Sequence, residues 1–377
     1  MSRSWPQVPL GDLLVEQKVR VGVFDADGLP LLGVSNIEGL HRTEKPRIAD
    51  MSRYLRVDYR WFAYNPMRIN VGSIGWAERH EQTGVISPDY VVFSCTDGIE
   101  PKLLYLFLRS AIGLHAINLE TAGSVRERLY FDFLARIRLP LPPLPEQRRI
   151  VVRIEELTAK INEARALRDQ SQKEIENLCR AVITQDPNVK LTPMRELVSL
   201  RSPDVTVQQD ESYQFAGVYC FGRGVFRAQI KSGMEFAYQK LTRLKAGNLV
   251  YPKLMAWEGA LGIVPPECDG CVVSTEFPVF EVLEDQVLPE VLDTYFRSPS
   301  VWPEISGSST GTNVRRRRLN PSDFLNYKMS LPSRATQERL RRVRAQTDTL
   351  KNLQAKTAAE LDALLPSILD KAFKGEL

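Results

Sequence analysis

The chain has 377 residues, of which 43% are hydrophobic and 25% are charged. This is the balance of a soluble globular protein, and the length allows two or three domains that each bury a core. No run approaches the roughly 18 consecutive apolar residues of a membrane span, and residues 1–6 lack the apolar core of a signal peptide. Five scattered cysteines predict no disulfide framework. We therefore expect a cytoplasmic protein with no membrane segment.

The formal net charge is only +4. A protein that binds nucleic acid unaided usually carries a stronger basic excess, because phosphate contacts dominate the affinity. Either nucleic acid is not the ligand, or the basic residues are concentrated in one place and a partner supplies further phosphate contacts. The charge by itself leaves both interpretations open.

Residues 1–143 have the pattern of an α+β domain. Alternating or β-branched runs at 85–86 and 90–93 predict short strands. Pro101 stands at the first position of a predicted helix, where the missing N–H is tolerated, and an amphipathic aromatic and leucine pattern follows it. A glycine- and arginine-containing loop is expected at 123–128.

A long helix is predicted next. Residues 146–183 contain no glycine or proline and are rich in helix-forming residues, while the proline run at 140–145 and Asp186-Pro187 bound them. Their apolar residues follow the alternating four-three spacing of a coiled coil, interrupted at Arg168 and Ser171. This predicted seam consists of Ile150, Ile154, Leu157, Ile161, Ala164, Ile175, Leu178 and Val182. A straight helix of this length would span about 57 Å.

The sequence then repeats itself. At an offset of 187 positions, residues 64–93 align with 251–280 without a gap, and seven of the thirty pairs are identical, where about two are expected by chance. The identical pairs are Tyr64/Tyr251, Gly72/Gly259, Gly75/Gly262, Val85/Val272, Ser87/Ser274, Val92/Val279 and Phe93/Phe280. Asp89/Glu276 is a similar pair in the same window, and Pro289 repeats Pro101. We expect a second α+β domain over residues 185–334 that resembles the first.

A second, more polar helix is predicted at about 335–365, within a C-terminal segment 335–377. Its apolar positions are Leu340, Val343, Leu350, Leu361, Leu364 and Ile368. Two such helices, at 144–184 and 335–377, can bury their seams against each other as an antiparallel coiled-coil pair that spaces the two domains. The alternative is that each helix packs only on its own domain.

Repeated positive loops are the candidate DNA contacts. Glycines and hydroxyls let backbone amides approach phosphates, and arginine binds phosphate or pairs with guanine. The candidates in the first copy are Arg68, Ser124, Arg126 and Arg128; those in the second are Lys253, Thr312, Asn313, Arg315, Arg316, Arg317 and Arg318. The alternative is a solvated charged surface, which the recurrence of the loop in both copies disfavours.

Three partial motifs indicate other chemistry. Asp89, Glu100 and Lys102 imitate the carboxylate pair and lysine of magnesium nucleases, although Glu100 also fits a helix start. Asn65-Pro66-Met67 resembles an incomplete adenine-methyltransferase loop. Cys268 and Cys271 have zinc-ligand spacing, with Cys220 as a third candidate, but a tight Asp-Gly turn explains that segment without metal. We expect no catalytic residue and no metal ligand in this chain.

Residues 139–151, with their proline-rich run followed by Glu146-Gln147, resemble the junction motif of type I restriction–modification specificity subunits. The ending at 364–377 resembles the same family, and the likeness extends over nearly the whole chain. The second copy departs from the junction motif, because residues 331–338 lack the proline run.

The resemblance implies an α+β fold with two similar target recognition domains, joined and spaced by two long antiparallel coiled-coil helices. It implies that the domains read a bipartite target in double-stranded DNA and that the helices dock two methyltransferase (modification) subunits, which a restriction/translocase subunit can join. S-adenosylmethionine, ATP and magnesium would belong to those partners, and this chain would hold no cofactor. The resulting prediction is a DNA-reading subunit without catalysis of its own. The alternatives are a specificity-like subunit of another phage-defence or orphan methyltransferase assembly, and a coiled-coil scaffold that binds only protein.

Overall fold

A computed structural model describes residues 5–22, 28–44, 50–121, 128–307 and 318–377. The chain divides into two compact units. Unit 1 comprises residues 1–166 and 356–377, and unit 2 comprises residues 167–355. The long helix α4 (Leu144–Thr184) contributes its first half to unit 1 and its second half to unit 2.

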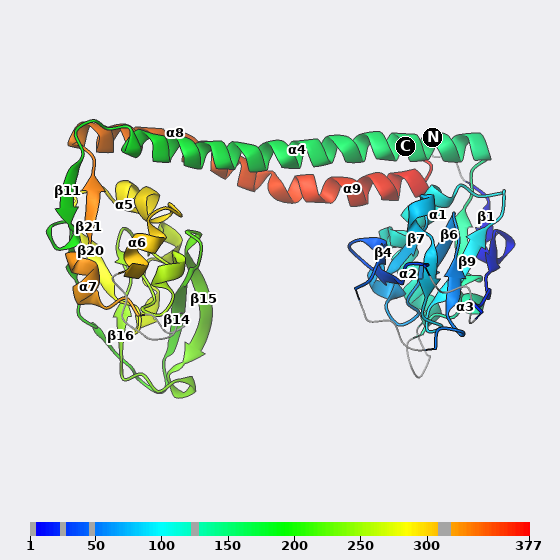
Figure 1. The fold of residues 1–377 in the computed structure, drawn as a ribbon, viewed down its shortest axis with the longest axis horizontal. Coiled ribbons are helices and arrows are strands. Elements are labelled where there is room, and N and C mark those ends of the chain that lie inside the picture. Colours follow the sequence, from blue (N-terminus) through cyan, green and yellow to red (C-terminus); the bar gives the residue numbers. More distant parts are fainter. Residues whose placement is uncertain (1–4, 23–27, 45–49, 122–127, 308–317) are drawn as a thin grey trace. The chain divides into compact units, whose positions relative to one another are not determined.

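Unit 1 combines short strands with helices (Figure 1). Its strands are β1 (Gln7–Pro9), β2 (Leu14–Glu16), β3 (Leu32–Ser35), β4 (Gly39–Arg42), β5 (Leu55–Val57), β6 (Trp61–Tyr64), β7 (Ile74–Trp76), β8 (Gly84–Ile86), β9 (Val91–Cys95) and β10 (Arg138–Pro140). Its helices besides α4 are α1 (Pro101–Arg109), α2 (Ala111–Thr121), α3 (Phe131–Leu134) and α9 (Ala358–Phe373). The strands expected at 85–86 and 90–93 and the helix starting at Pro101 are confirmed.

The main sheet of unit 1 is antiparallel, in the order β2-β9-β6-β7. Phe62 and Phe93 stack in its centre with ring centroids 4.9 Å apart. Their cluster continues through α1 into the helices, because Ile150 and Ile154 of α4 and Phe373 of α9 belong to the same core. The ends of the long helices are therefore part of the domain core.

Unit 2 contains the remaining elements (Figure 1). Its strands are β11 (Lys190–Pro193), β12 (Val198–Leu200), β13 (Val205–Thr206), β14 (Ser212–Tyr219), β15 (Gly224–Ser232), β16 (Lys240–Arg243), β17 (Leu249–Val250), β18 (Gly262–Ile263), β19 (Val272–Ser274), β20 (Val279–Val282) and β21 (Lys328–Leu331). Its helices besides α4 are α5 (Pro289–Phe296), α6 (Trp302–Gly307), α7 (Pro321–Asn326) and α8 (Arg334–Lys356).

Unit 2 repeats the strand order of unit 1. Its main sheet runs β12-β20-β17-β18, which matches β2-β9-β6-β7 element by element, and the two-stranded sheet β11-β21 matches β1-β10. A parallel contact between Leu31 and Val85 in unit 1 recurs as the pairing of Phe215 with Val272 in unit 2. The duplication inferred from the sequence is thus also a duplication of strand topology.

The units differ in one hairpin. In unit 1 the pair β3–β4 has four residues in each strand, whereas in unit 2 the pair β14–β15 has eight and nine and joins the five-stranded sheet β13-β16-β19-β14-β15. Its register shifts between Gln214 and Ala216, so the long strands carry an irregularity of the β-bulge type.

The helix predicted at 146–183 is confirmed as α4 (Leu144–Thr184). The continuous helix expected at about 335–365 is not found, because α8 ends at Lys356 and α9 begins at Ala358. The carbonyl of Thr357 accepts the hydrogen bond from Leu361 N–H at 3.0 Å, so a new helix starts there. Within the described residues, none of the helices combines the length and apolar character that spanning a bilayer demands.

In each unit, α4 runs antiparallel to a C-terminal helix. In unit 1, Arg165 forms an ion pair with Asp362 of α9 at 2.8 Å, and Arg149 donates to the carbonyl of Leu377 at 2.8 Å. In unit 2, both the backbone N–H and the hydroxyl of Ser333, just before α8, donate to Asp186 at 2.7 Å. Hydrogen bonds from Ser333 and Asn188 hold the pKa of Asp186 below its usual range.

The predicted apolar seam is only partly buried. Ile150, Ile154, Ile161, Ile175 and Leu340 are buried, and Leu157, Val343 and Leu361 are intermediate. In contrast, Leu178, Leu350 and Leu364 are 49%, 42% and 44% exposed, so the expectation that they lie in a buried seam is wrong. Towards its end α4 buries the predicted seam residues Ile175 and Val182 together with Cys179 and Ile183, which the seam does not contain. This is the 3.6-residue pattern of a helix packed on a domain, from which a 3.5-residue seam drifts by about 20° per heptad.

A buried glutamine fixes the start of a long helix in each unit. In unit 1, Gln147 accepts from Glu100 N–H at 2.7 Å and donates to the carbonyls of Gly98 and Pro142 at 3.1 and 2.9 Å. In unit 2, Gln337 accepts from Leu288 N–H at 3.0 Å and donates to the carbonyl of Pro332 at 3.0 Å. Each glutamine thereby satisfies the N-terminal amide of the helix that begins at Pro101 or Pro289.

Candidate nucleic-acid interface

A tight turn after β6 carries the first candidate contact in unit 1. Tyr64 is fully buried, and its hydroxyl donates to the carbonyl of Leu129 at 3.0 Å. Burial raises the pKa of the Tyr64 hydroxyl, which keeps it a hydrogen-bond donor. Asn65 then accepts from Met67 N–H at 3.0 Å, which closes the turn and leaves Met67 and Arg68 exposed. Arg68 is therefore accessible to a ligand.

The same turn follows β17 in unit 2. Tyr251 is fully buried at the position of Tyr64, and its ring stacks on Phe280. Both turns end in a glycine with a positive φ, 82° at Gly72 and 75° at Gly259, a conformation that side chains other than glycine rarely adopt. The identical glycines of the repeat thus have a backbone reason.

In each unit, the C-terminal end of the candidate DNA-contacting loop is hydrogen-bonded to the turn described above. Leu129 N–H donates to the carbonyl of Pro66 at 3.0 Å, and Leu319 N–H donates to the carbonyl of Lys253 at 2.9 Å. Both leucines are buried, so Arg128 and Arg318, which immediately precede them, are held beside the turns. The remaining loop candidates lie outside the described residues: Ser124, Arg126, Thr312, Asn313, Arg315, Arg316 and Arg317.

Arg128 has an aromatic partner in unit 1. Its guanidinium donates to the Tyr130 hydroxyl at 3.4 Å, and this bond together with the nearby Asp89 carboxylate raises the pKa of Arg128. Asp89 itself accepts from the hydroxyl of Ser87 at 3.3 Å. Arg128 is therefore tethered loosely and has no ion pair within 4 Å among the described residues.

The equivalent cations of unit 2 share one carboxylate. Glu276, which aligns with Asp89, pairs with Lys253 at 3.7 Å and directly with Arg318. A phosphate would therefore have to compete with Glu276 for these two side chains. The structure brings Lys253 and Arg318 together, as it brings Arg128 to the turn that carries Arg68.

Sequence reasoning missed the carboxylates and the buried glutamines. The pair Asp89/Glu276 was visible in the aligned window, but its position beside the arginines follows only from the return of each loop to its turn. Gln147 and Gln337 also align, at an offset of 190, and their burial was not evident from polar residues at a helix start.

The nuclease interpretation lacks a converged site. Lys102 pairs with Glu78 at 3.0 Å and with Glu155 at 3.6 Å, and Glu100 lies 3.8 Å from Arg148. Asp89, as described above, bonds Ser87. Within the described part of the chain, no three His, Cys, Asp or Glu side chains gather as a potential metal site.

The cysteine pair belongs to a core. Cys268 and Cys271 are both buried in an apolar cluster with Val250 and Val279, and burial raises the pKa of Cys268 to about 11. Zinc binds thiolates, which this environment disfavours. Cys220 has Glu258 as its hydrogen-bond partner. The pair packs as two small hydrophobic residues.

Comparisons with known proteins agree with one another. The family model for the "Type I restriction modification DNA specificity domain" matches residues 71–176. The type I restriction enzyme EcoKI specificity subunit of Escherichia coli (strain K12) is 24% identical over 330 residues, which cover 78% of this chain and 68% of that protein. The EcoBI specificity subunit of Escherichia coli is 24% identical over 307 residues, which cover 70% of this chain and 63% of that protein.

Solved structures have the same fold. A chain from a structure titled for complex assembly and conformational transition of the type I R-M system superposes over 100% of both chains, with a TM-score of 0.68 and 21% identity. The HsdS subunit from Thermoanaerobacter tengcongensis superposes over 99% of this chain and 97% of its own, with a TM-score of 0.54 and 21% identity. The resemblance expected from the junction motif is thus confirmed by independent sequence matches, and the fold likeness extends over the whole chain.

Proposed function

Because its sequence and fold group this chain with the type I restriction–modification specificity subunits, we propose that it reads a bipartite target in double-stranded DNA for such a complex. Each of two target recognition domains, at 1–143 and 185–334, reads one half of the target. The catalytic steps belong to partner subunits.

One observation carries this proposal: the same four-stranded sheet, the same turn and the same anchored loop occur twice in one chain. Each copy holds an arginine, Arg128 or Arg318, at the end of its loop. Arginines so placed can bind the DNA backbone and set the position of base-reading side chains, which is the usual division of work in DNA recognition. Two such surfaces on one chain suit a target made of two separated parts.

The helices supply the spacing and the docking surface in this proposal. Leu178, Leu350 and Leu364 are exposed on α4, α8 and α9, where an apolar partner surface can cover them. We infer that two methyltransferase subunits dock there with their S-adenosylmethionine, and that a restriction subunit using ATP and magnesium can join them. The small net charge of +4 fits a complex in which partners share the phosphate contacts.

The direct test is the pattern of methylated adenines in the genome of the source organism. We expect a bipartite methylated motif that disappears when this gene is deleted and returns when it is restored. A continuous motif, or a bipartite motif that survives the deletion, contradicts the proposal.

A second test concerns the spacing. Four residues added to α4 after Ser171, with four added at Thr357 to keep the antiparallel partner in step, lengthen the helices by about 6 Å, slightly more than one turn. We expect the unread spacer of the methylated motif to grow by one or two base pairs, at about 3.4 Å per pair. An unchanged spacer contradicts the spacing role of the helices while leaving DNA reading intact.

A further inference from the structure

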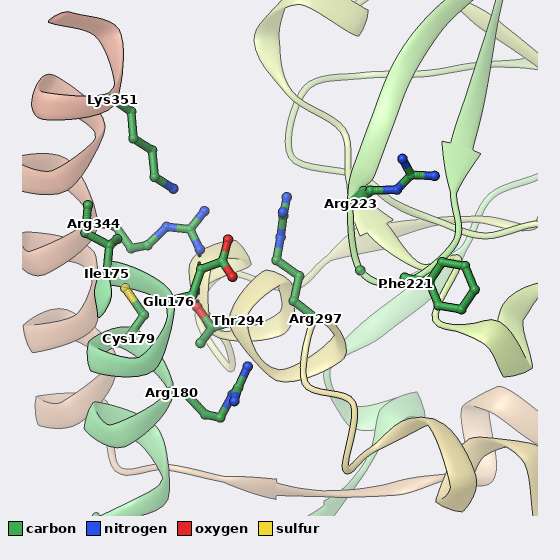
Figure 2. A pocket seen from close by; sticks show the side chains of 11 residues that line it. Ile175, Glu176, Cys179, Arg180, Phe221, Arg223, Thr294, Arg297, Arg344 and Lys351 are labelled. Atoms are coloured by element: carbon green, nitrogen blue, oxygen red, sulfur yellow. Dashed lines mark hydrogen bonds between the residues drawn. The ribbon is translucent and has the colours of Figure 1, made fainter. Parts of the chain in front are cut away.

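A cationic pocket lies within unit 2, away from the turns described above. Its volume is about 340 Å³, and its walls come from α4, α8, α5 and the tip of the β14–β15 hairpin. The charged residues that line it are Glu176, Arg180, Arg223, Arg297, Arg344 and Lys351. Figure 2 shows Arg344 and Lys351 extending from α8 towards the space that Arg297, the residue after α5, enters from the opposite side.

A buried carboxylate organises the inner end of this pocket. Asp293 is buried; it accepts a hydrogen bond from Arg344 at 2.8 Å and forms an ion pair with Arg297, whose Nε lies 2.9 Å from the carboxylate. Arg344 lies 3.3 Å from the hydroxyl of Thr294 as well. The Nε atom of Arg344 is buried and lacks a hydrogen-bond partner within the described structure. Asp293 therefore serves two guanidinium groups, Asp348 is a further carboxylate close to Arg344, and the lining cations still outnumber the carboxylates.

Two further cations form no direct ion pair. Within the part of the chain that the structure describes, neither Arg180 nor Lys351 forms an ion pair within 4 Å. Glu176 is the one acidic residue among the side chains that line the pocket. Like charges held close together are unfavourable unless an anion neutralises them. The pocket is thus electrostatically incomplete.

The hairpin wall is fixed in place. Phe221 adopts a φ of 62°, which is strained for a bulky residue, and Gly222 follows with 66°. Their N–H groups donate to the carbonyls of Glu258 and Gly259 at 2.8 and 3.0 Å. A Cβ at Gly222 would lie 2.9 Å from the Arg297 backbone, so the turn packs directly on α5. This contact places Arg223 at the rim.

Unit 1 provides an internal control. At an offset of 190, Ile154 and Ile161 stand where unit 2 has Arg344 and Lys351, and Asp370 stands where it has Arg180. Both isoleucines are buried. At the positions of Arg344 and Lys351 the duplicated fold therefore needs only apolar side chains, and buried ion pairs are generally no more stabilising than such packing. The cations of unit 2 require another explanation.

We propose that this pocket binds phosphate groups, carried either by the DNA backbone or by a free nucleotide. The terminal phosphate of a free nucleotide carries a charge of about −2 and would balance two cations. Each DNA backbone phosphate carries one negative charge, so two neighbouring ones would be needed. Arginine binds phosphate through paired N–H groups, and the Thr294 hydroxyl lies in the same wall. The volume lies within the range of small-ligand pockets, about 300–1,000 Å³.

The test compares two double variants of the full chain with the wild type. Arg180→Ala with Lys351→Ala removes the two cations that form no direct ion pair and leaves the Asp293 contacts in place. Lys173→Ala with Arg342→Ala removes the same charge from exposed positions on the same two helices, outside the pocket. Arg180→Asp, which installs the residue found at the equivalent place in unit 1, gives an independent variant if the double substitution impairs folding.

The first arm measures pyrophosphate and ATP binding by calorimetry. The second measures the affinity for duplex DNA with modification subunits present, at several salt concentrations. A free nucleotide as ligand predicts that the pocket variants bind ATP or pyrophosphate at least ~10-fold more weakly than the control, with equal DNA affinity. A backbone phosphate as ligand predicts at least ~10-fold weaker DNA binding and a salt slope lower by about 2 for the double variant.

Either outcome supports the pocket as a phosphate site and identifies the source. Pocket variants that match the control in both arms overturn the inference. The DNA arm rests on the proposed function, whereas the calorimetric arm does not. A wild-type complex without affinity for its target DNA would therefore contradict the proposed function and leave the pyrophosphate measurement decisive for the pocket.

Discussion

Units 1 and 2 each contain a four-stranded sheet with the same strand order, but the elements around that sheet differ between them. The order β2-β9-β6-β7 equals β12-β20-β17-β18, and each unit has the buried tyrosine, the turn and the anchored loop. The hairpin next to the sheet has four-residue strands in unit 1 and strands of eight and nine residues in unit 2. The helix surface beside it is apolar at Ile154 and cationic at Arg344.

This comparison separates two kinds of residue. Elements present in both units are those that fold the sheet and join it to the long helices, as Gln147 and Gln337 do. Elements present in only one unit are not needed to fold the sheet or to join it to the helices. Such elements can therefore provide a binding property of their own. The following predictions test this division by changing equivalent positions in the two units, from the largest expected effect to the smallest.

The buried glutamines should give the largest effect. Gln147→Leu leaves one amide and two carbonyls without partners, and Gln337→Leu leaves one amide and one carbonyl. Because each buried polar group left unpaired costs about 1–3 kcal/mol, we expect losses of about 3 kcal/mol and about 2 kcal/mol in unfolding free energy. Urea unfolding measures the loss, and hydrogen exchange at the first turns of α1 and α5 locates it.

Gln170→Leu is the matched control for both substitutions. Gln170 is exposed and bonds only Glu174, so its replacement should change the unfolding free energy by less than about 0.5 kcal/mol. Exchange at the first turns of α1 and α5 that stays at the wild-type rate in both variants would refute the idea that these glutamines join the domains to the helices.

The sequence predicted the long helix correctly, and its internal repeat corresponds to a repeated strand order, because both leave periodic signals. Identical residues at an offset of 187, such as Gly72/Gly259, mark turns that only glycine adopts readily. The absence of glycine and proline over 146–183 predicted α4 within two residues at its start and one at its end. Glycine and proline restrict or permit particular backbone conformations, so their positions predict turns and helices without knowledge of the fold.

The rest depended on contacts between residues far apart in the sequence. The helix break at Thr357 and the exposure of Leu178 are features that a heptad pattern does not contain. The pairing of Glu276 with Lys253 and Arg318 arises because one loop returns to one turn. The candidate residues Arg315, Arg316 and Arg317 lie outside the described residues, and their roles stay predictions.

A second prediction concerns Asp293, whose position in unit 1 is held by Tyr105. Burial tends to raise the pKa of Asp293, but Arg297 and Arg344 outweigh burial and hold it below its usual value. A lowered folded pKa stabilises the protein above the unfolded pKa of about 3.9, and this contribution is lost as the pH falls through the folded pKa. Asp293→Asn should therefore cost about 3 kcal/mol at pH 7 and less at pH 3.

Tyr105→Phe is the comparison in unit 1. Tyr105 accepts a hydrogen bond from Arg109, and its loss should cost about 1 kcal/mol without removing a charged group. Urea unfolding at both pH values checks the pair of variants. A penalty for Asp293→Asn that is the same at pH 3 and pH 7 is incompatible with a carboxylate held ionised by the two arginines.

The buried tyrosines give a third, smaller contrast. Tyr64 donates to the carbonyl of Leu129 at 3.0 Å, whereas the Tyr251 hydroxyl is buried with no partner within the described structure. Tyr64→Phe should therefore cost about 1–2 kcal/mol, and Tyr251→Phe should be neutral or stabilise by up to about 1 kcal/mol. Thermal unfolding of the two variants distinguishes them. Equal losses in both units would mean that the two hydroxyls have equivalent partners in solution.

The smallest expected effect is on DNA affinity. Glu276 neutralises Lys253 and Arg318, whereas Asp89 accepts from Ser87 and has no ion pair within 4 Å among the described residues. Glu276→Gln should therefore free two cations for phosphates and raise the affinity of the complex for target DNA by about 3-fold at low salt, while Asp89→Asn should change it less. Because freed cations release more counterions, the gain should shrink as salt increases. Binding measured across a salt series checks both variants. A Glu276→Gln variant that binds more weakly would show that Glu276 positions Lys253 and Arg318 for DNA, so that in unit 2 orientation matters more than neutralisation.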